Sequence, residues 1–137
     1  LYTPQPAPDL HFTSLGEARY RLVSSDVDRM AGLTPARLIR ANYAPAFATA
    51  QAVALPMVAD AVLASGQNAA VAGILRALGG SAYVLENTAR TLVEAGFRMV
   101  SDAPPIDQPV HTAVHLRHRT SPLHRALQRV MREAFAR

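Results

Sequence analysis

The residues best suited to chemistry in this chain are polar groups at the junction of two expected elements. The Ser65-Gly66-Gln67-Asn68 segment stands between an expected strand and the longest interior helix. Backbone N–H groups at a helix start, together with hydroxyl and amide side chains, form a natural receptor for a carboxylate or another anion. An alternative is that Ser65 only caps the helix. The sequence leaves both interpretations open.

The five histidines raise the question of a metal site. His111 and His115 share one face of an expected strand, but about 13 Å separates them at ~3.3 Å per residue, too far for direct chelation of one ion. His118 points to the opposite face, and His124 lies on the next helix. No Cys, Asp or Glu completes a ligand set near them. We therefore expect no metal and no other cofactor.

Nucleophilic catalysis has little support. Ser81 follows a glycine pair, but the segment 79–83 lacks the Gly-x-Ser-x-Gly elbow. The dinucleotide fingerprint and the P-loop are also missing, and Asp26 and Asp28 fall in a polar loop rather than forming a catalytic pair. We expect a binding protein and not an enzyme. A small α/β enzyme that depends on Ser81 is kept as an alternative.

Size and composition indicate one soluble globular domain. The chain has 137 residues, 50% of them hydrophobic and 18% charged. No apolar run approaches the ~20 residues of a membrane span, and there is no signal-peptide pattern and no cysteine. The first residue is leucine, so we expect the true start of the protein to be missing. All fourteen basic residues are arginine, and six of them follow His111 against one acid, Glu133.

The arginine-rich tail has two interpretations. A basic segment can contact nucleic acid. However, residues 121–136 predict an amphipathic helix with Leu123, Leu127 and Val130 on one stripe and its arginines on the opposite, solvated face. The amphipathic pattern explains the arginines without a nucleic-acid partner, and we do not expect this segment to bind DNA directly.

The elements that must position the polar groups follow from hydrophobic periodicity. Alternation at 20–24 predicts a strand, with Tyr20 and Leu22 on one face and Val23 on the other. A short helix is expected up to Arg40, a turn at 43–47 and one or two helical turns at 48–55. The rest of the order is strand 57–64, helix 67–78, strand 81–85, helix 87–95, strand 97–100 and strand 110–118. Such alternation predicts an α/β fold with a mostly parallel sheet and helices on its faces.

Four segments carry a family resemblance: 15–24, Tyr43-Ala44-Pro45-Ala46-Phe47, Gly79-Gly80-Ser81-Ala82-Tyr83, and 109–119. In their order and spacing they resemble the effector-binding region of bacterial LysR-type transcriptional regulators, over nearly the whole chain. The resemblance implies a Rossmann-like lobe of a periplasmic-binding-protein-like type 2 fold, a mixed sheet with helices on both faces. Residues 1–19 would end the first lobe, 20–118 would form the second lobe with two crossover strands, and 119–137 would return to the first.

The same resemblance implies a function and a site. A small, anionic effector would bind in the cleft between the lobes, and DNA would be bound only by an N-terminal winged helix-turn-helix that is lacking here. The protein would be a cytoplasmic homo-oligomer, dimer or tetramer, away from membranes. The positions that correspond to the family's cleft are Ser24, Tyr43, Phe47, Ser65 and His111, and the helix-start argument adds Gln67. A periplasmic-type solute receptor and a pure oligomerisation module are further alternatives.

Overall fold

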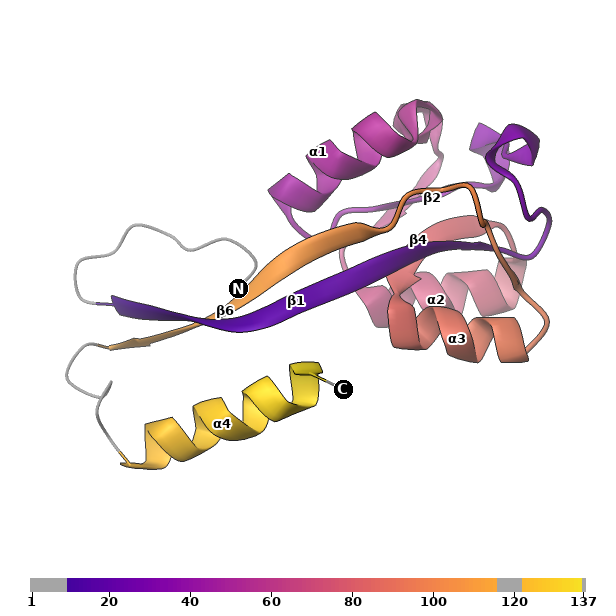
Figure 1. Ribbon diagram of the computed structural model, residues 1–137. Coiled ribbons are helices and arrows are strands. Elements are labelled where there is room, and N and C mark those ends of the chain that lie inside the picture. The colour runs from indigo at the N-terminus through magenta and orange to yellow at the C-terminus, as the bar shows by residue number, and fades with distance from the viewer. Residues whose placement is uncertain (1–9, 116–121, 137) are drawn as a thin grey trace. The chain divides into compact units, whose positions relative to one another are not determined.

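The computed structural model describes residues 10–115 and 122–136. It divides into two compact units: a central unit, Arg19–Ile106, and a terminal unit formed by Leu1–Ala18 and Asp107–Arg137. Two long strands, β1 (Leu10–Ser24) and β6 (Ile106–His115), have residues in both units and pair with each other (Figure 1). These two strands contain the segments 20–24 and 110–115 of the predicted crossover strands, whose role between two lobes stays a prediction.

The sheet of the central unit is built around β1. Strand β4 (Ser81–Leu85) pairs with it antiparallel, with Ser24 opposite Ser81, and β5 (Arg98–Met99) pairs with it antiparallel as well. Strand β2 (Ile39–Ala41) runs parallel to β3 (Leu63–Ser65), and a parallel bridge from Leu38 to Ser81 joins β2 to β4. Strands β2 to β5 therefore run in one direction, as predicted, and β1 is the antiparallel strand among them.

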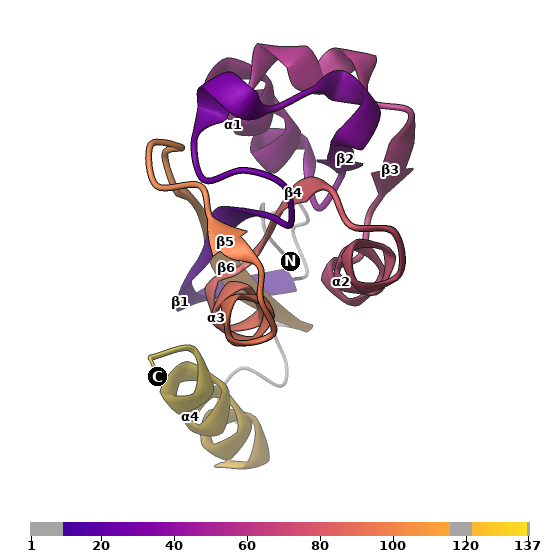
Figure 2. The same ribbon diagram turned by 90° about the vertical axis from the view of Figure 1, so that its right-hand side faces the viewer.

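Helices cover both faces of this sheet (Figures 1 and 2). Helices α2 (Asn68–Leu78) and α3 (Glu86–Glu94) pack on one face, where Val23 joins a buried cluster with residues of both helices. Helix α1 (Pro45–Ala54) lies on the other face, where Phe47 contacts Tyr20. The alternation predicted for 20–24 is confirmed, because Tyr20 and Val23 take opposite faces of β1.

Helix α2 ends at a glycine pair whose conformation the fold requires. Gly79 and Gly80 have φ of 71° and 111°, a region that side chains disfavour. A Cβ on Gly80 would also lie 2.5 Å from the carbonyl oxygen of Arg37. This turn brings the chain directly into β4, so the predicted helix end and the strand at 81–85 are both confirmed.

A buried glutamine joins helix α1 to the sheet. Gln51 is fully buried, and its Oε1 accepts a hydrogen bond from the N–H of Ala41 while its Nε2 donates to the carbonyl of the same residue. On its other side, β2 pairs with β3, so the Gln51 amide takes the place of a neighbouring strand. The glutamine therefore positions α1 beside β2 and satisfies two buried backbone groups.

Three predicted segments were wrong. Residues 57–64 do not form a strand: the 3-10 helix η3 (Pro56–Asp60) precedes the short β3, because Pro56 suits the first helical position. The helix expected up to Arg40 is only the 3-10 turn Pro35–Arg37, and Ile39 begins β2. The expected turn at 43–47 contains the start of α1, again with a proline, Pro45, at the first helical position.

The remaining differences lie at element ends. The strand predicted from residue 20 begins at Leu10, and the one predicted from 110 begins at Ile106. The helix predicted at 87–95 begins one residue earlier, at Glu86, and ends at Glu94. Residues 1–9 and 116–121, which belong to the predicted connector and strand end, lie outside the described residues.

The terminal unit contains a strongly amphipathic helix, α4 (Pro122–Ala136). Its apolar stripe is exposed in the described structure, with Leu123 79% and Val130 59% accessible. Arg125, Arg129 and Arg132 are also exposed, on the opposite side of the helix. The predicted segregation of the two kinds of side chain is therefore confirmed.

Candidate functional site

The strand–helix junction after β3 keeps polar groups at the surface. Ser65 is half-buried, and its carbonyl accepts the N–H of Asn42 at 2.8 Å. Its hydroxyl accepts only a long hydrogen bond, 3.4 Å, from the N–H of Gln67. Gln67 is the N-cap residue of α2 and is exposed, and no side chain caps this helix. Ser65 is therefore not the cap of α2, and the first-turn N–H groups have no partner within the helix.

Asn68, the fourth residue of that segment, has a structural role. Its Oδ1 accepts the N–H of Leu85 at 2.8 Å, and its Nδ2 donates to Thr88 Oγ1 at 3.0 Å. The side chain thereby ties the start of α2 to the end of β4 and the start of α3. Of the polar segment, Ser65 and Gln67 remain available to a ligand.

Tyr43 and Phe47 belong to one aromatic cluster, but they differ in exposure. Phe47 is 0% exposed and lies edge-on to Tyr20, Tyr43 and Tyr83. Tyr43 stacks on Tyr20 at 4.8 Å and is only half-buried. Tyr43 can therefore offer part of its ring to a ligand, whereas Phe47 can only support it from below.

Two phenol groups anchor this cluster. The hydroxyl of Tyr43 donates to the carbonyl of Tyr83 at 2.6 Å, and the hydroxyl of Tyr83 donates to the carbonyl of Pro104 at 2.8 Å. Burial raises the pKa of Tyr83 to about 12. Its phenol is therefore a neutral donor at physiological pH and not an acid–base group.

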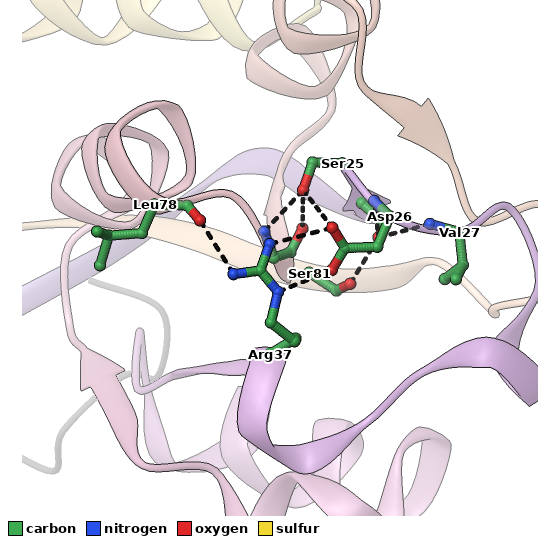
Figure 3. Close-up of polar contacts among 8 residues, drawn as sticks. Ser25, Asp26, Val27, Arg37, Leu78 and Ser81 are labelled. Carbon is green, nitrogen blue, oxygen red and sulfur yellow. Dashed lines mark hydrogen bonds and ion pairs between the residues drawn. The ribbon is translucent and has the colours of Figure 1, made fainter.

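Ser24 is fully buried at the end of β1, and its hydroxyl is fully occupied. It accepts the N–H groups of Asp26 and Val27 at 3.0 and 3.1 Å and shares a 2.7 Å hydrogen bond with the Ser81 hydroxyl (Figure 3). Two lone pairs and one proton are all that a hydroxyl offers. Ser24 therefore shapes the turn after β1.

The same bond bears on the alternative of a serine nucleophile. Ser81 is 2% exposed, and its hydroxyl bonds to another serine and not to a base. A catalytic serine needs both an adjacent general base and access to substrate. The position of Ser81 offers neither.

An ion pair that sequence reasoning missed closes this turn. Arg37 binds the Asp26 carboxylate through Nε at 3.0 Å and Nη2 at 3.1 Å, and its Nη1 donates to the carbonyl of Leu78 at the end of α2 (Figure 3). The hydrogen bond from Arg37 is the main cause that lowers the pKa of Asp26. Ser25 donates to the same carboxylate and accepts the N–H of Gly80. The Ser-Ser-Asp sequence after a strand indicates a turn. The sequence does not reveal that Arg37 is the partner of Asp26.

His111 belongs to the terminal unit, unlike the other five predicted site residues, which all lie in the central unit. It is half-buried on β6. Three residues before it on the strand, Gln108 is 5% exposed, and its Oε1 has no hydrogen-bond partner among the described residues. A buried, unpaired carbonyl oxygen is a candidate ligand contact, and nothing in the local sequence distinguished it.

Residues 10–115 and 122–136 contain neither a metal-ligand cluster nor a membrane-spanning helix. No group of three or more His, Cys, Asp or Glu side chains there could hold a metal ion. None of the helices described is both long and apolar enough to cross a membrane.

Comparison of the fold finds regulatory domains of LysR-type regulators. The regulatory domain of HypT from Salmonella typhimurium has a TM-score of 0.64 at 17% identity, over 96% of this chain and 68% of that chain. The regulatory domain of MetR, a LysR family regulator from N. meningitidis, has a TM-score of 0.64 at 14% identity, over 99% and 69%. Full-length LysG from Corynebacterium glutamicum has a TM-score of 0.66 at 18% identity, over 98% and 48%.

These similarities establish the fold. The chain has the periplasmic-binding-protein-like type 2 architecture of LysR regulatory domains, so the predicted fold class is confirmed. It spans about half the length of LysG. No family model and no curated protein sequence matches the chain.

Proposed function

We propose that this chain is the effector-sensing regulatory domain of a LysR-type transcriptional regulator. The observation that supports the proposal is a fold shared with HypT, MetR and LysG over 96–99% of the chain. In the proposed protein, a winged helix-turn-helix that precedes this region binds DNA, and the regulator acts as a dimer or tetramer.

The proposed effector is a small anionic metabolite bound between the two lobes of the regulator. One of the solved LysG structures contains its bound effector Arg, whose carboxylate is the kind of group that a helix start favours. In this chain, the side chains of the exposed Gln67 and the half-buried Ser65 lie beside the first-turn N–H groups of α2. Together these groups would bind the carboxylate of the effector. Tyr43 would flank an apolar part of the effector.

The other predicted residues have supporting or separate roles in this proposal. Ser24 and Phe47 are fully buried and hold the turn after β1 and the ring of Tyr43 in place. His111 lies on β6 in the terminal unit, and its role in effector binding stays a prediction. Regulation then follows from linkage: an effector that binds one arrangement of lobes or subunits more tightly shifts the equilibrium toward it. A coupling of about 1–3 kcal/mol is sufficient for control.

Two experiments test the proposal. The coding sequence upstream of Leu1 should encode a winged helix-turn-helix; a signal peptide there would instead indicate a solute receptor and refute a regulator.

A panel of amino acids and dicarboxylates should contain a compound that raises the melting temperature of the domain. Calorimetry with that compound should show weaker binding to Gln67→Ala and Ser65→Ala, while Arg90→Gln, on the exposed face of α3, should bind it unchanged. Equal affinity in all four proteins would refute the proposed site.

A further inference from the structure

A groove begins at the first turn of α2, next to the strand–helix junction, and is lined by residues of α2 and α3, all within the central unit. The groove is open to solvent, and its volume is about 320 Å³. Each of the two helices connects parallel strands, so they run in the same direction, and the Asn68–Thr88 hydrogen bond joins their first turns. The groove is lined by Asn68, Ala69, Ala72, Arg76, Asn87, Thr88 and Thr91.

The lining is cationic and contains no acid. Arg76 makes no ion pair or hydrogen bond within the described part of the chain, whereas Arg37 pairs with Asp26, and Arg90 pairs with Glu86 at 3.9 Å. A guanidinium without a carboxylate partner presents five N–H donors to whatever enters the groove. The small side chains of Ala69 and Ala72 leave space beside it.

Two further donors face the same space. Thr88 Oγ1 accepts the Asn68 amide, so the hydroxyl proton of Thr88 is left to donate. Asn87 Oδ1 accepts the N–H of Thr88 at 2.8 Å, which leaves the Asn87 Nδ2 group free to donate. Hydroxyl, amide and guanidinium donors thus line one groove that has no carboxylate.

We propose that this groove, which the donors of Arg76, Asn87 and Thr88 line, binds a small metabolite that carries a phosphate or carboxylate group. Charge-assisted hydrogen bonds from arginine to such groups are the strong class. The volume matches the lower end of ligand pockets, roughly 300 Å³, and so suits a ligand of few heavy atoms. The proposal goes beyond the effector site and does not depend on the regulatory function.

Titration of the ¹⁵N-labelled chain with inorganic phosphate, and separately with succinate, tests the proposal at constant ionic strength. Saturable shifts are expected for the Arg76 Nε–H, the Asn87 side-chain amide and the Thr88 backbone. The tighter of the two anions identifies the chemistry preferred. Arg76→Gln should weaken binding about tenfold, as expected for a lost hydrogen bond to a charged group. The matched control Arg90→Gln removes the same charge from α3 outside the groove and should bind unchanged.

A second variant, Ala69→Glu, tests the same groove without a change at Arg76. Ala69→Glu places a carboxylate in the lining but is compatible with folding, because an acid is favourable in the first turn of a helix. It should abolish the saturable shifts. Shifts that stay linear with concentration, or an affinity that Arg76→Gln and Ala69→Glu leave unchanged, would mean an adventitious ion only and would overturn the proposal. Failure here would leave the effector site at Ser65 and Gln67 untouched, since its test uses different variants.

Discussion

The free energy of unfolding of this protein should fall between pH 10 and pH 12 because of one tyrosine. Burial raises the pKa of Tyr83 to about 12, whereas a tyrosine in the unfolded chain ionises near pH 10. Below pH 10 both states keep the proton. Between pH 10 and 12 the unfolded state loses it first, so the free energy of unfolding decreases as the pH rises.

The size of the effect follows from the two pKa values. At pH 11 the unfolded state gains about 1.4 kcal/mol relative to the folded state, the equivalent of one pKa unit. The composition makes this measurable, because the chain has no lysine and no cysteine, and its fourteen arginines stay charged in this range. Tyrosines dominate the alkaline titration, and Tyr83→Phe removes only one of them.

Urea unfolding of wild type and Tyr83→Phe at pH 9 and pH 11 checks the prediction. At pH 9 the variant should be less stable by about 1 kcal/mol, since the Pro104 carbonyl loses its donor. At pH 11 this difference in the free energy of unfolding should vanish, because only the wild type is destabilised by ionisation of Tyr83. If the two proteins lose equal stability between the two pH values, Tyr83 ionises normally and the argument from burial is wrong.

Three further predictions concern the framework around the site. Gln51→Leu should lower the free energy of unfolding in urea by about 2–4 kcal/mol, because the buried N–H and C=O of Ala41 lose their partners. Gly80→Ala should cost more than about 2 kcal/mol, given its φ of 111° and a carbonyl 2.5 Å from the new Cβ, whereas Gly73→Ala, in open space on α2, should stabilise by about 0.5–1 kcal/mol. Asp26→Asn should be less stable than wild type at neutral pH, and acid titration should bring the two together as the pH falls below 3.8, because the folded-state pKa of that carboxyl is lowered.

The sequence predicted the elements whose signals are local. The apolar stripe of Val71 and Leu75, the glycine pair after Leu78 and the alternation around Tyr20 are signals that span only a few residues. The helix and the strand after it formed where expected, and the strand at Tyr20 formed but begins ten residues earlier. Local signals also misled at 57–64. An apolar run after Pro56 fits either a strand or a helical turn, and periodicity alone does not decide between them.

What sequence reasoning missed depends on partners far along the chain. The Gln51 amide bonds to the backbone of Ala41, ten residues earlier in the chain. Arg37 contacts Asp26 only because the fold brings the end of β1 beside the end of α2. For the site, the junction at Ser65 and Gln67 could be anticipated because a strand end and a helix start adjoin there. The burial of Phe47 could not be anticipated, because it depends on Tyr20 and Tyr83 from two other segments.

The residues that stabilise this fold and the residues that we propose to bind ligands are largely different, although both kinds occur on the same helices and strands. Tyr83, Ser81 and Ser24 face the interior and bond to one another's segments, whereas Gln67 and Arg76 project from the start and the end of α2 with few ties. Substitutions at the second set can therefore change a ligand without a large cost in stability. A fold held by buried residues can be kept while exposed residues change, which is consistent with TM-scores of 0.64–0.66 to HypT, MetR and LysG at only 14–18% identity.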